Sequence, residues 1–282
     1  MKNILELEEA QDPSGNNLMV VDCFNLAFRY KHSGEYDMKV PLLRTIRSLA
    51  RSYSCADVVI LSDWGSSSFR RETYDRYKRR EHDNSPEEQE KFKAFIEGFE
   101  EALAMIREIF PTIKLKNVEA DDLAGYIVKK YKDKYDNIWL ISTDKDWDQL
   151  LAPNVHRFSF YTRKEYTVEN MWEVHGCDDP EQFTSMKVLM GDPGDTIPGI
   201  HLVGAKRAYN LIREHGSALD IYMAIPLEGK QQVIQNINRS ADLIMRNYQL
   251  MDIFTYCEEA INHPDSSNLE WVDNYLKENL KV

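Results

Sequence analysis

The sequence lacks the features that mark membrane, secreted and zinc-binding proteins. No apolar run reaches the roughly 18 residues that a membrane-spanning helix needs. The acidic, polar N-terminus has no basic segment leading into an apolar one, which a signal peptide would require. The four cysteines include no CxxC pair, so no zinc or redox motif is indicated. We therefore expect a cytoplasmic protein with reduced thiols, no membrane contact and a loosely held tail over residues 1–17.

Basic residues are also in the minority. The chain has 35 Lys and Arg against 47 Asp and Glu, giving a net charge of −12. Proteins that bind nucleic acids usually carry a basic surface. The acidic total does not exclude such a partner, because nine acids assigned below are expected to hold metal ions and the other 38 nearly balance the bases. Net charge alone therefore does not decide the class of function.

Short apolar runs alternate with helical patterns over the first two thirds of the chain. Runs at 18–21, 58–61 and 138–142 predict buried strands, with a brief strand at 113–115 and edge strands within 155–168. Helices are expected at 40–53, at 85–110 and at 119–135, whereas 64–84 has no clean period and is interpreted as exposed and mobile. From 179 onward the chain is almost wholly helical. This pattern predicts an α/β core over 18–174, with a mostly parallel central sheet flanked by helices, and a C-terminal helical lobe over 175–282.

Three of the predicted strands are each followed within two residues by an aspartate: Asp22, Asp63 and Asp144. The carboxyl ends of parallel strands meet at one sheet edge, where ligands bind, so these side chains are expected to converge. Helix starts and loops add six more acids: Glu119, Asp121, Asp122, Asp146, Asp192 and Asp195. Individually such residues are often only turn or cap residues. As a set they would repel one another strongly, which favours bound Mg²⁺ or Mn²⁺.

A basic and aromatic segment follows Asp63. Residues 69–80 contain six bases and two acids with aromatics between them, a composition suited to phosphate pairing and base stacking. A solvated charged loop is the alternative interpretation. The predicted DNA contacts of the α/β core are, in chain order, Arg29, Lys31, Arg70, Tyr77, Arg79 and Arg80.

A glycine-rich turn lies in the helical lobe. Residues 191–199 read GDPGDTIPG and are followed by Gly204, Lys206 and Arg207 at a new helix start. Backbone amides at a helix N-terminus bind phosphate, and this spacing matches a helix–hairpin–helix reader of the DNA backbone around 186–215. An ordinary corner between two helices is the alternative.

The motifs together resemble the bacteriophage 5′-3′ exonuclease and flap endonuclease family, kin to the 5′-nuclease domain of bacterial DNA polymerase I. The resemblance is carried from about residue 18 to beyond 215 by these segments: VVDCFN, SDWGSSSFR, YK at 77–78, VEADDLAGYIV, LISTDKDWDQLL, and GDPGDTIPGI with GAKRA. Two features depart from the family pattern. Serines occupy 66–68 where a basic residue is common, and Glu81 stands where an arginine is usual. The loop at 201–203 is also bulkier than the usual hairpin.

The resemblance implies a PIN-like 5′-nuclease core and a two-metal site formed by the nine acids listed above. It also implies a catalytic lysine at Lys78 beside Tyr77, and a helical arch over 66–110 through which a free 5′ end threads. A potassium ion is implied near 199–205, in the helix–hairpin–helix (H3TH-type) motif.

We therefore expect a structure-specific 5′-nuclease that cuts branched or 5′-flap DNA in replication or repair. The catalytic residues would be Lys78, Asp22, Asp63 and Asp144, with two Mg²⁺ ions about 3.5–4 Å apart, and the enzyme is expected to be a monomer. The alternatives are a PIN-type magnesium ribonuclease and a non-catalytic protein that binds branched DNA. An aspartyl-phosphate phosphatase is disfavoured, because its DxD motif would follow the first strand, where the chain reads Asp22-Cys23-Phe24.

Overall fold

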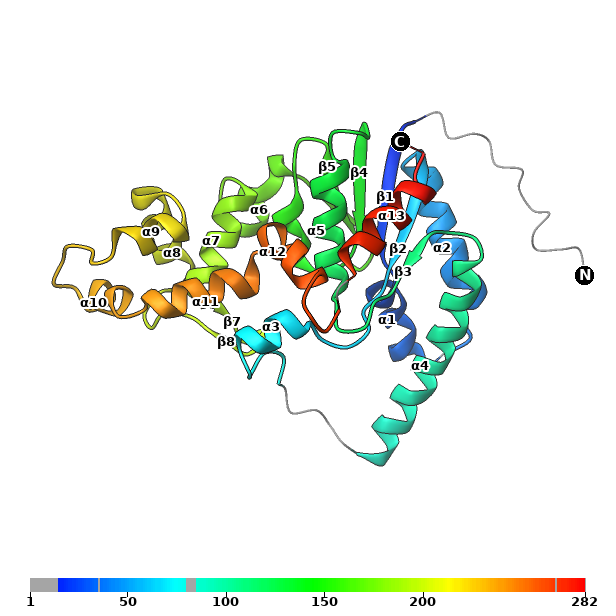
Figure 1. Cartoon of the computed structure of the whole chain (residues 1–282), viewed down its shortest axis with the longest axis horizontal. Coiled ribbons are helices and arrows are strands. Elements are labelled where there is room, and N and C mark those ends of the chain that lie inside the picture. The colour runs from blue at the N-terminus through cyan, green and yellow to red at the C-terminus, as the bar shows by residue number, and fades with distance from the viewer. Residues whose placement is uncertain (1–14, 35, 80–84, 267, 282) are drawn as a thin grey trace, which may run out of the picture.

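A six-stranded sheet forms the centre of the molecule. The structure is a computed structural model that describes residues 15–34, 36–79, 85–266 and 268–281. The strand order is β3-β2-β1-β4-β5-β6, and every neighbouring pair is parallel except β5 and β6. The predicted α/β class with a mostly parallel sheet is confirmed (Figure 1). The strands are β1 (Asn17–Asp22), β2 (Cys55–Leu61), β3 (Thr112–Ile113), β4 (Asn137–Ile141), β5 (Val155–Ser159) and β6 (Lys164–Tyr166).

Helices cover both faces of the sheet, as the fully apolar strands require. Successive residues of β1 point to opposite faces: Leu18 and Val20 join one buried cluster, and Met19 and Val21 join another. The first cluster is completed by α5 (Ala120–Tyr131), α12 (Ile253–Ile261) and α13 (Leu269–Asn279). The second is completed by α1 (Cys23–Ser33), α2 (Lys39–Ser52) and α4 (Pro86–Arg107). Each apolar strand therefore contributes to two cores.

The described part of the predicted arch region, 66–79 and 85–110, contains two helices. Ser85 caps α4 by accepting a hydrogen bond from the Glu88 amide at 3.4 Å, which confirms the predicted start. The interpretation of 64–84 as exposed and mobile was wrong for its first part, because α3 (Ser68–Thr73) forms there behind the cap Ser67 and buries Ser68 and Arg70. This helix is too short to show a period, and burial of one face stabilises it instead. Residues 80–84 lie outside the described residues.

The C-terminal third has its own apolar core. Its regular elements, preceded by η3 (Val168–Asn170), are α6 (Met171–His175), α7 (Pro180–Met190), β7 (Gly191–Asp192), η4 (Pro193–Asp195), β8 (Ile197–Pro198), α8 (Ala205–His215), α9 (Ala218–Ala224), α10 (Gln232–Asn238) and α11 (Ala241–Met251). The chain then returns to the sheet, since α12 and α13 pack on α5. The last two helices of the predicted lobe over 175–282 thus pack on the core of the sheet.

The structure also shows the state of the cysteines and the character of the helices. All four cysteines are buried and free, in agreement with the predicted thiols. Among the described residues, no helix combines the length and the apolar character that crossing a bilayer requires.

Candidate functional site

Two strand-end aspartates converge at the carboxyl edge of the sheet. Asp22 ends β1 and caps α1, where its Oδ1 accepts a hydrogen bond from the Asn25 amide at 3.1 Å. Its Oδ2 accepts one from the Ser142 hydroxyl at 3.0 Å, just past the end of β4. Asp63, two residues past β2, accepts a hydrogen bond from the Ala120 amide at 2.6 Å, at the start of α5. Three neighbouring strands thus bring their ends to one place, as predicted.

Mutual repulsion and burial raise the pKa values of these carboxyl groups. Burial raises the pKa of Asp22 well above its usual range, and the charges of Asp63 and Asp121 raise it further. Burial, followed by the charges of Asp121 and Glu119, raises the pKa of Asp63 to about 7. The pKa of Asp144 also rises to about 7, through desolvation and then through Asp121. A divalent cation would remove this penalty, because it would pair with the charged forms.

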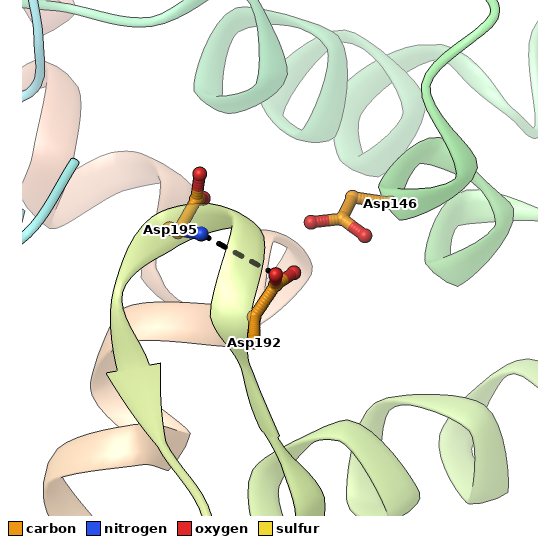
Figure 2. A group of neighbouring side chains, drawn as sticks. All are labelled: Asp146, Asp192 and Asp195. Carbon is orange, nitrogen blue, oxygen red and sulfur yellow. Dashed lines mark hydrogen bonds between the residues drawn. The ribbon is translucent and has the colours of Figure 1, made fainter. Parts of the chain in front are cut away.

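A second acidic group joins the sheet to the helical lobe. Asp146 projects from η2 (Lys145–Leu150) toward Asp192 and Asp195 on the turn between β7 and β8 (Figure 2). One carboxylate oxygen from each of the three lies within 4.8 Å of the others. Asp192 Oδ1 accepts hydrogen bonds from the Gly194 amide at 2.8 Å and the Asp195 amide at 3.3 Å, which fixes the turn. Three all-oxygen donors at this spacing suit a hard divalent cation.

Lys187 was missed by the sequence analysis. It lies on α7, and its Nζ is 2.9 Å from Asp192 Oδ2 and also contacts the Asp146 carboxylate. Burial alone would raise the pKa of Asp192, but the Lys187 ammonium outweighs it and the pKa is lowered. The signal available in the sequence was a single lysine between the apolar residues Met186 and Val188.

One cleft joins the Asp146–Asp192–Asp195 group to Asp121 and Asp144 at the edge of the sheet. It has a volume of about 530 Å³ and is lined by Ser66, Lys78, Asp121, Asp144, Asp146, Asp192, Gly194 and Asp195. Lys78 joins the two units, because its backbone amide donates to the Asp195 carbonyl at 3.0 Å and its Nζ lies 3.0 Å from Glu119 Oε1. Its φ of +53° is uncommon for a residue with a side chain, so the surrounding contacts hold it there.

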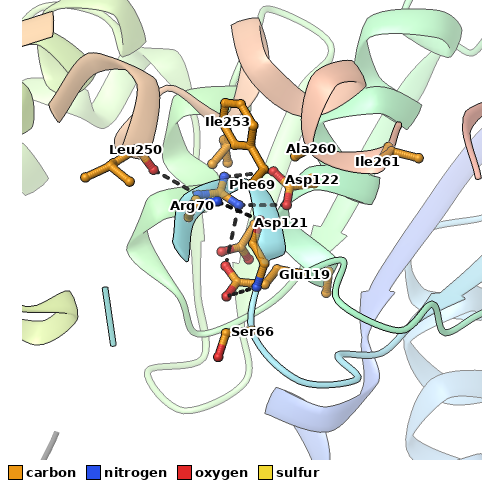
Figure 3. A network of polar contacts seen from close by, with 12 residues as sticks. Ser66, Phe69, Arg70, Glu119, Asp121, Asp122, Leu250, Ile253, Ala260 and Ile261 are labelled. Carbon is orange, nitrogen blue, oxygen red and sulfur yellow. Dashed lines mark hydrogen bonds and ion pairs between the residues drawn. The ribbon is translucent and has the colours of Figure 1, made fainter. Parts of the chain in front are cut away.

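A buried ion-pair network underlies this cleft and corrects three predictions (Figure 3). Arg70 is 2% exposed; its guanidinium donates to both oxygens of Asp122 at 2.7 Å, and its Nε donates to the Leu250 carbonyl at 2.9 Å. Tyr77 is 4% exposed and its hydroxyl donates to Glu119 Oε2 at 2.9 Å. Neither Arg70 nor Tyr77 can contact DNA as predicted. Asp122 has both oxygens engaged by Arg70, so it does not face the cleft as a metal ligand.

The same network keeps Glu119 ionised. Burial would raise the pKa of this carboxyl group, but Lys78 and then Arg70 outweigh that effect and lower it. The Ser67 amide also donates to Glu119 Oε1 at 3.2 Å. Glu119 therefore stays charged at the wall of the cleft.

The other predicted DNA contacts of the core lie in different environments. Arg29 donates to the Thr45 hydroxyl at 2.7 Å and packs over the Phe160 ring, so it is already engaged within the core. Lys31 lies over the rings of Phe28 and Phe92. Arg79 is exposed, and Arg80 lies outside the described residues. For Lys31 and Arg79 the DNA contact stays a prediction.

The predicted helix–hairpin–helix segment forms a tight turn between α7 and α8. A Cβ on Gly199 would lie 1.8 Å from the Met190 carbonyl oxygen, so only glycine fits there. Gly204 caps α8 and has open space where a Cβ would stand, which leaves the helix N-terminus accessible. Lys206 and Arg207 are exposed in the first turn, with Arg207 also donating to the Leu202 carbonyl at 2.6 Å.

Comparison with known proteins agrees with this geometry. Residues 17–176 match the model of the 5′-3′ exonuclease N-terminal resolvase-like domain, and residues 178–273 match that of the 5′-3′ exonuclease C-terminal SAM fold. The flap endonuclease of Escherichia phage T5 is 45% identical over 286 residues, covering 99% of this chain and 96% of the relative. DNA polymerase I of Rhizobium leguminosarum is 28% identical over 244 residues, covering 79% of this chain but only 23% of the polymerase.

Solved structures of similar proteins have the same fold as this chain. The T5 D15 protein co-crystallised with metal ions aligns with a TM-score of 0.89 at 44% identity, covering 94% of this chain and 98% of that one. A pseudo-enzyme–product complex of a T5 D15 flap endonuclease variant with DNA and metal ions aligns with a TM-score of 0.85, also at 44% identity, covering 93% of this chain and 98% of that one. Because both halves of the chain match and the acids meet in one cleft, the protein belongs to the 5′-3′ exonuclease family of metal-dependent nucleases.

Proposed function

We propose that the protein is a structure-specific 5′-nuclease that hydrolyses DNA phosphodiester bonds near a free 5′ end, on branched or 5′-flap DNA. The observation that carries this proposal is the single cleft in which carboxylates from the sheet and from the helical lobe meet Lys78. The T5 flap endonuclease, similar over almost the full length, supports the substrate class. An enzyme of this kind encoded by a phage would act on DNA in the cytoplasm of the bacterial host.

The cleft suits two Mg²⁺ ions, for which Mn²⁺ could substitute. Asp22, Asp63, Asp121 and Asp144 would hold one, with Glu119 behind them, and the second would be held by Asp146, Asp192 and Asp195. When bound, such ions supply Lewis-acid chemistry, lowering the pKa of a water molecule and stabilising the leaving oxygen. The raised pKa values of Asp63 and Asp144 support this assignment, since cation binding would relieve the repulsion that causes them.

Lys78 would neutralise the phosphate as charge develops in the transition state. Its ammonium lies at the cleft wall, paired with Glu119. Burial would lower the pKa of Lys78, but the charge of Glu119 and the other acids nearby outweigh this effect and hold the pKa well above its usual range. A fixed cation of this kind stabilises charge without reorganising. Gly204, Lys206 and Arg207 would hold the duplex backbone at the N-terminus of α8, with a K⁺ ion near 199–205, while Arg79 would contact the strand near its 5′ end.

The alternatives are less well supported. A PIN-type ribonuclease would not need the hairpin that presents the α8 N-terminus, an element suited to duplex backbone. A non-catalytic DNA-binding protein would not need two acidic groups around Lys78 at the wall of the cleft. Such an arrangement lowers the free energy of unfolding unless cations compensate the negative charges.

The test is cleavage of a 5′-labelled flap DNA with Mg²⁺ or with EDTA, using substrates whose 5′ end is free or blocked. We expect Mg²⁺-dependent cleavage near the junction, and a much slower reaction when the 5′ end is blocked. Lys78→Ala should lower kcat by about 10²–10³-fold, the usual effect of removing one electrostatic stabiliser, while the flap is still bound.

Lys277→Ala, a change on α13 outside the cleft, serves as the control and should leave kcat unaltered. Equal cleavage of a single-stranded RNA of the same length would favour the ribonuclease. Binding of the flap without any cleavage in Mg²⁺ or Mn²⁺ would favour the non-catalytic alternative.

A further inference from the structure

A second buried ion-pair network joins η2 to the sheet and to the helical lobe. Asp148 on η2 is fully buried, and its carboxylate accepts hydrogen bonds from Arg157 Nε at 2.5 Å and Nη2 at 2.7 Å. His175 Nε2 lies 2.7 Å from Asp148 Oδ2 and is the donor, because an ionised carboxylate oxygen can only accept. Arg157 lies on β5 and His175 ends α6. None of the three is among the residues that line the acidic cleft.

The network continues to the candidate metal ligands at the edge of the sheet. Arg157 Nη1 donates to the Ser142 carbonyl at 3.0 Å. The Ser142 hydroxyl in turn donates to Asp22 Oδ2 at 3.0 Å and accepts the Asp144 amide at 3.1 Å. The Tyr166 ring lies over the Arg157 guanidinium, with the ring centroid 4.0 Å from Cζ. A continuous series of short contacts therefore runs from the helical lobe to two acids of the cleft.

The geometry of η2 explains what this network controls. A 3-10 helix has three residues per turn, so successive side chains point about 120° apart. Asp146 contacts Lys187, the next residue Trp147 is fully buried and donates its indole N–H to Asp121 Oδ1 at 2.6 Å, and Asp148 enters the network. Three consecutive side chains thus have partners in three directions, and together these contacts fix the rotation of η2 about its axis.

Stability alone is a weak explanation for such a network. Taking Asp148, Arg157 and His175 out of water costs free energy, and well-packed apolar residues often stabilise a core as well as a buried ion pair does. The network has instead one specific consequence, which is the orientation of η2. The hydrogen-bond partners behind a set of metal ligands govern its affinity, because they hold the ligands in the geometry that the ion requires.

We propose that His175 is a positioning residue that acts through Asp148 to hold Asp146 in the orientation that divalent-cation binding requires. The inference rests on the proposed function, in which the Asp146–Asp192–Asp195 group holds one of two Mg²⁺ ions. His175 contacts neither the ion nor DNA in this role. Since it lies on α6, the packing of the helical lobe on the sheet and the affinity of the metal site are coupled through one imidazole.

The primary measurement is calorimetric titration of the full chain with Mn²⁺, without DNA and well below the melting temperature. Asp146→Asn identifies the binding event that belongs to the Asp146–Asp192–Asp195 group. His175→Ala should weaken that event by about 10- to 100-fold, the usual effect of losing a partner behind a metal ligand. His175→Gln should recover most of the affinity, because its amide can donate to Asp148 from nearly the position of Nε2.

Cleavage of the 5′-labelled flap gives a second measurement. The Mg²⁺ concentration for half-maximal rate should rise in His175→Ala by a factor similar to that in the titration. Saturating Mg²⁺ should restore most of kcat, and binding of the flap in EDTA should be unaltered. If His175→Ala does not fold, His175→Asn replaces it with the same expectations, because its shorter amide does not reach Asp148.

Tyr135→Phe is the matched control for a loss of stability. It removes a buried hydrogen bond of 2.7 Å from the Tyr135 hydroxyl to Asp57 near the start of β2, away from the strand ends that form the cleft. This variant should have a lower melting temperature and an unaltered Mn²⁺ affinity. The same pattern in His175→Ala, or equal weakening in His175→Ala and His175→Gln, would overturn the positioning role. A wild type that binds Mn²⁺ but cleaves no flap would instead reject the nuclease function, and the calorimetric comparison would still decide the role of His175.

Discussion

Lys187 links the helical lobe to the acidic cleft through a single ammonium group. Its Nζ contacts Asp146 on the sheet side and Asp192 on the lobe side, and its side chain is only 12% exposed. An internal cation beside these oxygens compensates their charge in the metal-free protein. It also competes with any divalent cation for the same oxygens.

Lys187→Met should separate these two effects. Without the ammonium, the metal-free protein should be less stable, because two partly buried carboxylates lose their partner. Mn²⁺ should bind the Asp146–Asp192–Asp195 group about tenfold more tightly, since no residue competes for the ligands, a change of about 1.4 kcal/mol. Isothermal titration calorimetry with Mn²⁺, together with thermal unfolding in EDTA, measures both. The exposed Lys145→Met controls for a general loss of positive charge; equal tightening in that variant would contradict the specific competition.

At the residue scale, the predictability of the site depended on local context. Asp22, Asp63 and Asp144 could be placed at one edge because each follows an apolar strand, and parallel strands share their carboxyl edge. The buried positions of Arg70 and Tyr77 could not be inferred. A basic aromatic segment has the same composition whether its side chains face solvent or a buried acid. Burial of Arg70 depends on Asp122, which lies 52 residues away in the sequence.

At the element scale, α3 is the junction of three parts of the molecule. Arg70 on α3 reaches Asp122 on α5 and the Leu250 carbonyl on α11. Its Nη1 also lies 3.6 Å from Glu119 Oε2. The sequence predicted the sheet and the capped helix α4 because those patterns are local. It did not predict α3, a six-residue helix that is stabilised mainly by these tertiary contacts.

Arg70→Met should destabilise the protein by about 3–5 kcal/mol, because it leaves the Asp122 carboxylate buried without its partner. The double change Arg70→Met with Asp122→Asn should recover part of this loss, since it removes the unpaired charge. Urea denaturation of the wild type, both single variants and the double variant gives the coupling free energy.

The surface pair Lys91–Glu87 on α4 is the matched control, where Lys91→Met should change stability by no more than about 1 kcal/mol. A small loss for Arg70→Met, or strict additivity, would show that the network does not join these helices.

At the scale of the whole molecule, the net charge of −12 is not spread evenly. Carboxylates from both units are concentrated in one cleft, and the structure brings together Asp121 and Asp144 from the sheet with Asp192 and Asp195 from the lobe. Sequence patterns could predict the sheet and the helical lobe separately. They could not predict that α12 and α13 return to the sheet, because helical periodicity does not say which surface an apolar face will cover. The sequence therefore could not predict that carboxylates of the sheet and of the helical lobe would meet in one cleft.

The concentration of acids predicts a stability that depends on pH and on metal together. The pKa values of Asp22, Asp63 and Asp144 are raised in the folded, metal-free protein, to about 7 for the latter two. An unfolded aspartate has a pKa of about 3.9, so the folded state holds these protons more tightly. The stabilisation that comes from binding these protons is fully present below pH about 4. It is lost as the pH rises through about 7.

In EDTA, the melting temperature should therefore fall between pH 6 and pH 8.5, and Mg²⁺ should restore it most strongly at the high end, where the carboxylates are ionised and ready to bind. Differential scanning calorimetry over this range, with EDTA or saturating Mg²⁺, measures the effect. Asp63→Asn should flatten the pH dependence in EDTA and weaken the Mg²⁺ response, because it removes one of the titrating groups. Asp133→Asn, an exposed change beyond the C-terminus of α5, should leave both unaltered. A melting temperature in EDTA that is constant or rises from pH 6 to pH 8.5 would mean that the acids are not repelling one another in the folded molecule, and that cation binding is not needed to relieve them.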